Sequence, residues 1–176
     1  TQNVIVGSNK IALDAAEKKA KDLGYNTIIL SSLVEGESKD AAKFFAAIAK
    51  EVSRTGTPVP KPACIIAGGE TTVTIKGKGK GGRNQEFALS AALEISGCDG
   101  IVVLSAGTDG TDGPTDATGA IVDSNTCKNA KVKFCLKPEE YLRRNDSYNF
   151  FNNTGEHIIT GPTMTNVMDI MISLID

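Results

Sequence analysis

The sequence predicts an α/β protein with a mixed, partly parallel sheet flanked by helices, a layered α/β sandwich. Residues 1–62 alternate between strand-like and helix-like patterns, which favours strands covered by helices. The nearly continuous apolar run Ile101–Ala106 is typical of a strand that is buried on both faces. The length of 176 residues, with 40% apolar and 23% charged residues, suits one soluble α/β domain over residues 1–176.

The first part of the chain contains two strand patterns and two helix patterns. Apolar residues recur at helical spacing after Asn9, which can cap a helix, and Gly24 can end that helix. A second helical stripe follows Ser38 or Asp40, either of which can serve as its cap. Prolines within residues 54–62 exclude a helix there. The expected strands are Val4–Val6 and Thr27–Leu30, and the expected helices cover residues 9–23 and 41–52.

The rest of the chain continues the alternation. Apolar and β-branched runs predict further strands, and the stretch within Val167–Ile175 fits either a strand or a helix. A helix is expected from Arg83 to Ile95, a second begins at Pro138, and a short third is capped by Asp146 or Ser147. The remaining expected strands are Ala63–Ala67, Thr72–Lys76, Ile101–Ala106, Ala120–Val122 and His157–Thr160.

Composition excludes several classes of function. With 19 basic and 21 acidic residues, the formal net charge is −2, so a broad basic face for nucleic acid is not expected. The sequence has no apolar run long enough for a transmembrane helix, so no membrane partner is expected. The four cysteines are widely spaced and there is one histidine, which disfavours a zinc site and favours a reducing compartment.

The chain begins Thr1-Gln2-Asn3 without an initiator Met, so we expect it to be a piece of a longer protein. A cytoplasmic location is the expectation, and a mitochondrial one is the alternative if a targeting peptide lies upstream.

A lysine–glycine tract, Lys76 to Gly82, precedes the helix that begins at Arg83. Glycines allow close backbone approach, and free N–H groups at a helix start favour an anion. Lys78, Lys80 and Arg83 add positive charge. The tract matches neither a Walker A motif nor a dinucleotide fingerprint. It predicts a phosphate-binding loop; the alternative is a flexible, solvated loop.

An acidic loop follows the strand expected at Ile101–Ala106. Asp109, Asp112 and Asp116 lie beyond its carboxyl end, where ligands gather in open α/β sheets. Such carboxylates can hold Mg²⁺, or one can act as a general base toward a hydroxyl. The alternative is that Asp and Gly residues simply build turns here.

Three further loops contain polar groups that suit a binding site. Glu70 follows Gly68-Gly69 and can orient a lysine or bind a substrate hydroxyl. The loop over residues 160–166 offers donors for a small oxyanion, although a plain turn is favoured. Asn145-Asp146-Ser147 either enters the site or caps a helix, and capping is favoured.

Several motifs together resemble the class II glycerate kinases, the family formerly named hydroxypyruvate reductases, whose C-terminal region is called the MOFRL domain. The resemblance covers nearly the whole chain from Val4 onward. It rests on the segments 68–74 (GGETTVT), 79–86 (GKGGRNQE) and 106–116 (AGTDGTDGPTD), and is extended by 145–148 (NDSY), 160–163 (TGPT) and Asn166-Val167.

This resemblance implies a kinase that transfers the γ-phosphate of ATP to glycerate with Mg²⁺, with the 2-hydroxyl as the expected acceptor. Family members have two α/β domains with the active site in the cleft between them. This chain resembles the C-terminal domain, so its partner is the N-terminal domain of the same polypeptide, which carries the catalytic lysine. We expect the isolated chain to be folded but inactive, and a homodimer is left open.

The candidate site residues follow from the loops and the resemblance. Catalytic roles are expected for Arg83, which matches the arginine of the family's GGRNQE motif, and for Asp109. Asp112 and Asp116 are the expected metal ligands. The expected contacts to substrate or phosphate are Gly69, Glu70, Thr71, Lys78, Lys80, Gly81, Gly82, Asn84, Thr163 and Asn166.

Two alternative functions are kept. One is a non-catalytic module that binds an anion or a nucleotide. The other is a hydroxypyruvate reductase. The sequence has no dinucleotide fingerprint, which argues against the reductase, although a cofactor could bind the N-terminal domain.

Overall fold

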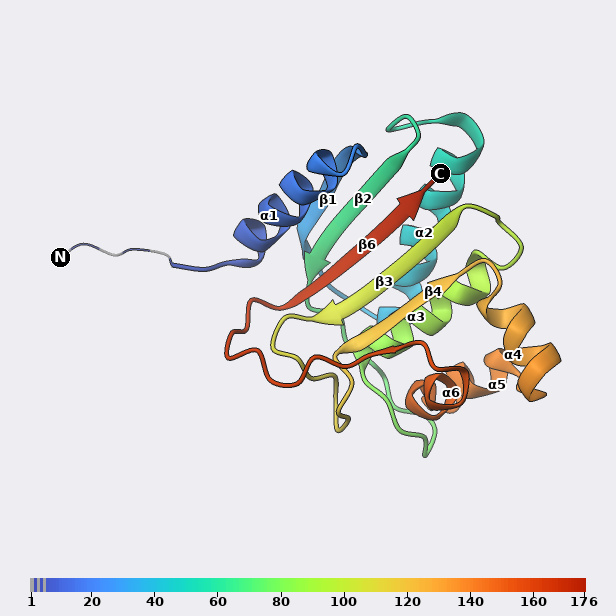
Figure 1. Cartoon of the computed structure of the whole chain (residues 1–176). Helices are drawn as coiled ribbons and strands as arrows, with labels where there is room; N and C mark the ends of the chain where they lie inside the picture. The colour runs from blue at the N-terminus through green and yellow to red at the C-terminus, as the bar shows by residue number, and fades with distance from the viewer. Residues whose placement is uncertain (1, 3, 5) are drawn as a thin grey trace.

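A six-stranded mixed sheet organises the chain in the computed structural model, which describes residues 2, 4 and 6–176 (Figure 1). The strand order is β1-β2-β6-β3-β4-β5. β1 and β2 are parallel, and every other neighbouring pair is antiparallel, which confirms the predicted mixed, partly parallel sheet. The strands are β1 (Asn26–Val34), β2 (Ala63–Gly69), β3 (Ile101–Gly107), β4 (Gly119–Asp123), β5 (His157–Ile158) and β6 (Asp169–Ile175).

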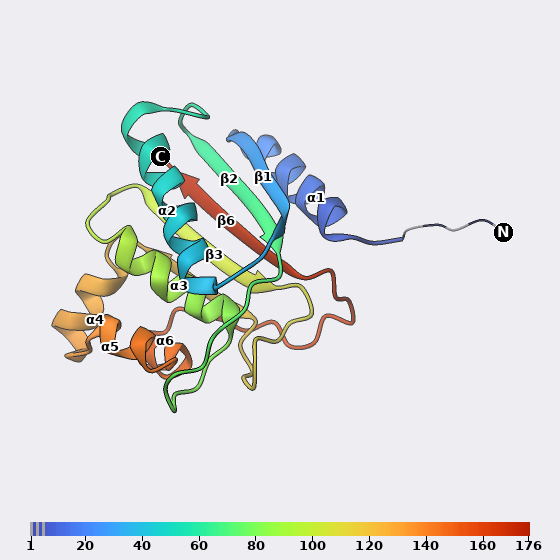
Figure 2. The same ribbon diagram turned by 180° about the vertical axis from the view of Figure 1, so that it is seen from behind.

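Helices flank this sheet on both faces. α1 lies on one face over β1 and β2, whereas α2 and α3 lie on the other face (Figures 1 and 2). α4, α5 and α6 gather beside α3. No helix in the described part of the chain is long and apolar enough to span a membrane. The helices are α1 (Asn9–Asp22), α2 (Ser38–Thr55), α3 (Arg83–Glu94), α4 (Thr126–Phe134), α5 (Pro138–Arg143) and α6 (Ser147–Thr154).

Two hydrophobic cores hold the layers together. The larger core lies between the sheet and the helices α2 and α3, and includes Phe45, Ile65 and Phe87. The smaller core lies under α1, where Leu13 packs with Ile66. Burial of these apolar side chains on both sides of the sheet is the main force that stabilises the fold.

The last strand, β6, lies in the middle of the sheet. It inserts between β2 and β3, so that Asp169 at its start is in register with Gly69 and Gly107 at the ends of those strands. The stretch within Val167–Ile175 is therefore a strand, the first of the two predicted alternatives. Because of this register, the loops that follow β2 and β3 lie at the same end of the sheet, next to the candidate site.

Two strand predictions are wrong over most of their length. Val4 and Val6 lie exposed outside any strand, and Ile5 is outside the described residues. In the segment Thr72–Lys76, Thr72 alone forms a β-bridge, with Glu37. The rest of this segment leaves the sheet, because its backbone runs on to the turn before α6.

The other differences concern helix starts and one missed helix. The cap of α1 is Ser8, whose Oγ accepts from the N–H of Ile11, while Asn9 is buried within the helix and donates to the carbonyl of Val167. α4 was not predicted, because its polar sequence carries a weak helical stripe. The strand expected over His157–Thr160 is limited to His157 and Ile158.

Candidate active site

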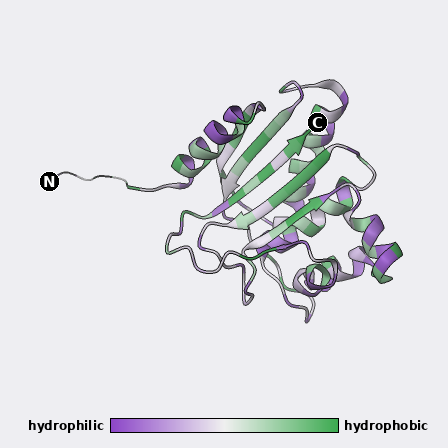
Figure 3. Cartoon of the chain, viewed as in Figure 1, coloured by the Kyte–Doolittle hydropathy of each residue, from purple (hydrophilic) through white to green (hydrophobic). Residues whose placement is uncertain are grey.

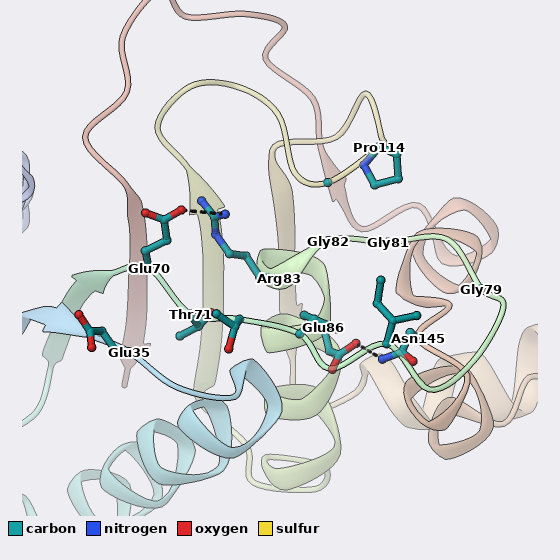
Figure 4. Close-up of a pocket in the computed structure, with 14 residues that line it drawn as sticks. Glu35, Glu70, Thr71, Gly79, Gly81, Gly82, Arg83, Glu86, Pro114 and Asn145 are labelled. Carbon is teal, nitrogen blue, oxygen red and sulfur yellow. Dashed lines mark hydrogen bonds and ion pairs between the residues drawn. The ribbon is translucent and has the colours of Figure 1, made fainter.

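A cavity of about 690 Å³ opens beside the C-terminal ends of β1 and β2 (Figure 4). Glu35 and Glu70–Val73 line it from the ends of these strands. The glycine tract, Arg83 and Glu86 line the opposite side. Of the residues predicted to bind a ligand, the cavity brings together Glu70, Thr71, Gly81, Gly82 and Arg83.

Arg83 is held in place by two carboxylates. Its Nε and Nη2 atoms donate to Oδ2 and Oδ1 of Asp169, at 2.6 and 3.0 Å. Its Nη1 atom lies 3.2 Å from Oε1 of Glu70. The Asp169 side chain is fully buried, whereas that of Glu70 is 55% exposed. The hydrogen bond with Asp169 raises the pKa of Arg83 above its usual value, so the guanidinium is a fixed positive charge in the cavity wall.

Sequence reasoning missed Asp169 as a site residue. The one signal was a carboxylate directly before the apolar strand residues 170–175, where a buried charge needs a partner. That partner is 86 positions away, and strand insertion alone brings the two together.

Asn84 has a structural role, and its predicted substrate contact stays a prediction. It is buried, and its Nδ2 donates to Oδ1 of Asp169 at 3.0 Å and to Oδ1 of Asp112 at 3.3 Å. Its Oδ1 accepts from Oγ of Ser105 at 2.7 Å. Both the donor and the acceptor of the Asn84 amide are therefore hydrogen-bonded within the protein. Through its bond to Asp169, Asn84 orients the carboxylate that anchors Arg83.

Asp112 caps α3 from the acidic loop. Its carboxylate oxygens accept from the N–H groups of Asn84 and Gln85, at 3.0 and 2.9 Å, and from Nε2 of Gln85 at 2.9 Å. Burial raises the pKa of Asp112, and these hydrogen bonds partly offset that effect. The N–H groups that were expected to bind phosphate are therefore bonded to a carboxylate of the same chain.

The glycine tract is ordered by the turn between α5 and α6. Oδ1 of Asn145 accepts from the N–H groups of Lys76 and Gly77, at 2.8 and 2.9 Å. Oδ1 of Asp146 accepts from the N–H of Lys80 at 2.9 Å. Asp146 occupies the N-cap position of α6, as predicted, but its side chain makes no cap bond to that helix. The tract is thus held against this turn and the start of α6, which argues against a flexible, solvated loop.

The two predicted phosphate-binding lysines lie away from the cavity wall. Nζ of Lys80 lies 4.1 Å from the centre of the Tyr148 ring, a cation–π contact. The Tyr148 hydroxyl donates to Oδ1 of Asp116 at 2.8 Å, and this bond lowers the pKa of Asp116. Lys78 is exposed, and neither lysine is among the described residues that line the cavity.

Asp109, Thr163 and Asn166 form a second polar group beyond the end of β3. Nδ2 of Asn166 lies 3.5 Å from Oδ2 of Asp109, and the N–H of Thr163 donates to the Asp109 carbonyl at 3.1 Å. The structure thus brings these three predicted residues together, outside the lining of the cavity. The catalytic role of Asp109 stays a prediction.

The predicted metal ligands each have a different partner. Asp112 caps α3, and Asp116 accepts from Tyr148. Among the described residues, no three acidic, histidine or cysteine side chains converge as a metal site would need. The assignment of Asp112 and Asp116 to a metal therefore stays a prediction, and the geometry gives both residues other roles.

Gly69 is needed for close packing. Its φ of 146° is rare for other residues, and a Cβ there would overlap the backbone of Val34 on β1. Gly69 therefore allows β2 to end tightly against β1, and the predicted ligand contact at this position stays a prediction.

Glu86 is a second site residue that sequence reasoning missed. It follows Arg83 by three positions, so both side chains lie on one face of α3 and both line the cavity. Its Oε2 accepts from Nδ2 of Asn145 at 2.9 Å, and its buried Oε1 has no partner among the described residues. Burial raises the pKa of Glu86, although the hydrogen bond from Asn145 lowers it in part.

The cavity contains more acid than base. Carboxyl groups of Glu35, Glu70 and Glu86 line it, and Arg83 is the lining residue with a positive charge among those described. An anionic ligand would therefore have to displace Glu70 from Arg83 or arrive together with a cation.

Comparisons with known proteins place these features in a family. Residues 63–169 match the model of the MOFRL family. The chain is 48% identical over 171 residues to the D-glycerate 2-kinase of Thermotoga maritima, covering 97% of this chain and 41% of that protein. It is 42% identical to a putative hydroxypyruvate reductase of Agrobacterium vitis, covering 97% of this chain and 45% of that one.

A solved structure agrees with the sequence comparison. The crystal structure of glycerate kinase from Thermotoga maritima superposes with a TM-score of 0.97 at 47% identity. The match covers 99% of this chain and 42% of the crystallised chain. The chain described above thus spans about two fifths of the length of the relatives that it matches.

Proposed function

Because this chain belongs to the MOFRL family, we propose that it is the C-terminal domain of a glycerate kinase that transfers the γ-phosphate of ATP to glycerate. The proposal is supported by the likeness to a D-glycerate 2-kinase over 97% of the chain. Residues 1–176 are then one α/β domain, and an N-terminal domain on the same polypeptide completes the active site. We propose 2-phosphoglycerate as the product.

The observation that carries this proposal is the anchored arginine. Phosphoryl transfer requires accurate positioning and neutralisation of charge far more than covalent help from the protein. Asp169 is buried and holds two nitrogens of Arg83, while Nη1 contacts the half-exposed Glu70. A carboxylate or phosphate oxygen of the substrate can replace Glu70 at Nη1 while Asp169 keeps the guanidinium oriented.

ATP and Mg²⁺ are the proposed cosubstrate and cofactor. The acidic cavity fits a metal–nucleotide complex better than a free nucleotide, because it lacks the positive charge that a bare triphosphate needs. Glu35 and Glu70 offer exposed carboxylate oxygens, the ligand type that Mg²⁺ prefers. The bound ion would neutralise charge on the phosphates, and a lysine from the N-terminal domain would add to this.

The test is an assay of the longer protein that carries this domain, with ATP, Mg²⁺ and D-glycerate. We expect phosphoglycerate as product, with ³¹P NMR identifying the phosphorylated hydroxyl. Arg83→Ala should lower kcat/KM by on the order of a hundredfold or more, because an oriented charge is lost. Arg54→Ala, at an exposed position at the end of α2, is the matched control.

Three outcomes would contradict the proposal. Near-normal turnover of Arg83→Ala would remove the arginine from the catalytic machinery. Nucleotide binding without turnover, measured by calorimetry on the longer protein, would favour a non-catalytic binding module. Oxidation of a nicotinamide cofactor by hydroxypyruvate would favour a reductase, the name given to the Agrobacterium vitis relative.

A further inference from the structure

One face of the sheet is apolar well beyond the area that α1 covers. On this face, the strand register places Leu104 of β3 opposite both Ile172 of β6 and Ile121 of β4. Val102 lies opposite Leu174 of β6 and, on its other side, opposite Asp123 of β4. Figure 3 shows the hydrophobic colouring continuing across these neighbouring strands. We call the five apolar side chains, on β3, β4 and β6, the open sheet face.

α1 covers the neighbouring half of the same face. Its Leu13 packs with Cys64 and Ile66 of β2, and Ile172 and Leu174 of the open sheet face pack against the border of this small core. In the part of the chain that the structure describes, no helix lies over β3 and β4 on this side (Figure 1). Ile121 is 43% exposed, whereas Val103 on the opposite face of the sheet is fully buried under the other helices.

The residue pattern of these strands is that of a sheet covered on both faces. An antiparallel sheet with one side in water usually alternates apolar and polar residues. Here both faces of β3 and β6 are largely apolar, as in strands with helices on either side. Of the five side chains, Ile121 is exposed and the other four are partly buried, so apolar area stays accessible on this face, a feature of interaction sites.

The shape of the open sheet face suits one helix. Three strands at a spacing of about 4.8 Å span on the order of 10–14 Å, which is close to the diameter of a helix with its side chains. α1 packs on the same side of the sheet, over β1 and β2, and so borders the open sheet face along one side (Figure 1). A second flat sheet would meet α1 before reaching β6, whereas a helix beside α1 would pack without obstruction.

We propose that an amphipathic helix from the remainder of the same, longer polypeptide packs on the open sheet face beside α1. This rests on the proposed function in one respect, that the chain is part of a longer protein. About three fifths of the length of the Thermotoga maritima kinase lies outside the match, which is ample chain for such a helix. Covalent connection gives the helix a high effective concentration, which favours it over a second copy of the chain.

Cysteine labelling of the longer protein tests this inference. Ile121→Cys reports on the open sheet face, and Val132→Cys, at a 74% exposed position on α4, is the matched control. Cys98 and Cys135 are replaced by serine. Cys64 and Cys127 can stay, because burial raises their pKa to about 11 and about 12, which keeps the thiols protonated. The protein is labelled with a maleimide, and mass spectrometry of its peptides measures the labelling rate of each cysteine separately.

We expect the cysteine at position 121 to react at least about tenfold more slowly than the one at 132, at every protein concentration. Equal labelling rates would overturn the proposal. Slow labelling at position 121 that becomes fast on dilution would also overturn the proposal, because a second copy of the chain would then cover the open sheet face. A benzophenone attached at position 121 should cross-link to a peptide outside the 176 residues of this chain, on the same polypeptide. A cross-link to a peptide from within these residues would contradict it.

This experiment separates the two proposals. Protection at position 121 in a protein without glycerate kinase activity would leave the helix in place and refute the proposed function. Full activity with an unprotected position 121 would do the reverse.

Discussion

The Asp169 carboxylate at the start of β6 holds the Arg83 guanidinium at the start of α3 through two nitrogen–oxygen contacts, of 2.6 and 3.0 Å. Asn84 donates to the same carboxylate, and Gly69 and Gly107 flank it in register on the neighbouring strands. This ion pair joins the central strand to the cavity wall. Disturbing it should therefore affect the orientation of Arg83 before it affects the rest of the fold.

The first prediction concerns Asp169→Asn in the longer protein. The amide keeps the size of the side chain but loses one acceptor and the charge, so Arg83 is no longer fixed. We expect kcat/KM to fall by on the order of a hundredfold, since small displacements of positioning groups have effects of this size. Asp22→Asn, at an exposed position at the end of α1, is the control. An unchanged kcat/KM in Asp169→Asn would show that Arg83 needs no anchor.

The second prediction concerns the cap of α3. Asp112→Ala leaves the N–H groups of Asn84 and Gln85 without their acceptor, and also frees the Gln85 amide. Loss of a cap together with unsatisfied buried donors should lower the free energy of unfolding by about 2–4 kcal/mol. Urea denaturation of this chain measures it. Asp116→Ala, in the same loop but exposed, should change the free energy of unfolding by less than about 0.5 kcal/mol. Equal effects would argue against the cap.

The third prediction concerns the contact of the glycine tract with α6. A Cβ at Gly81 would overlap Oγ of Ser147, while the Ser147 Cβ would lie at an acceptable 3.5 Å. Ser147 Oγ is buried without a partner among the described residues, so Ser147→Ala should be nearly neutral. Gly81→Ala should cost on the order of 1–3 kcal/mol through overpacking, and the double variant should recover most of that loss. Purely additive effects in thermal unfolding would contradict this contact.

The fourth prediction concerns the pH dependence of stability at Glu86. Burial raises the pKa of Glu86 above its ordinary 4.5, so the folded chain holds this proton more tightly than the unfolded chain. The stability linked to this proton is present below pH 4.5 and is lost as the pH rises through the raised pKa. Glu86→Gln should therefore be more stable than the unchanged chain near pH 8, and this advantage should shrink toward pH 4.

Urea midpoints of the two chains across this range provide the measurement for Glu86. Glu35→Gln, which changes an exposed carboxylate that lines the same cavity, is the matched control. A difference between Glu86→Gln and the unchanged chain that stays constant with pH would show that the buried carboxyl does not titrate in this range.

Local sequence patterns were sufficient for most elements of the fold. The apolar stripes that predicted helices over residues 41–52 and 83–95 lie on the faces of α2 and α3 that pack on the sheet. The patterns failed where local preference and tertiary pairing conflict. The segment Thr72–Lys76 has strand-like alternation, yet its N–H groups bond to Asn145 and to Glu37 outside any sheet. Short β-branched runs cannot reveal whether a neighbouring strand is available.

The candidate site was predictable only in part. Glu70 was predicted because it directly follows a strand, and Arg83 because it opens a helix after the glycine tract and matches the family's motif. The structure places both at the cavity. The predicted phosphate contacts of Lys78 and Lys80 stay predictions, and neither lysine lines the cavity, because charge and glycine content do not tell which way a side chain points. Lys80 instead stacks on Tyr148, a residue that is remote in the sequence.

The sequence by itself determined the class of fold, the positions of most strands and helices, and the motifs of the family, because these depend on residues that are close together in the chain. The tertiary structure decided that β6 lies between β2 and β3 and therefore that Asp169 meets Arg83. It also decided that the Asp112 carboxylate caps α3. These outcomes depend on strand order and on contacts over long sequence separations, and local periodicity carries no information about either.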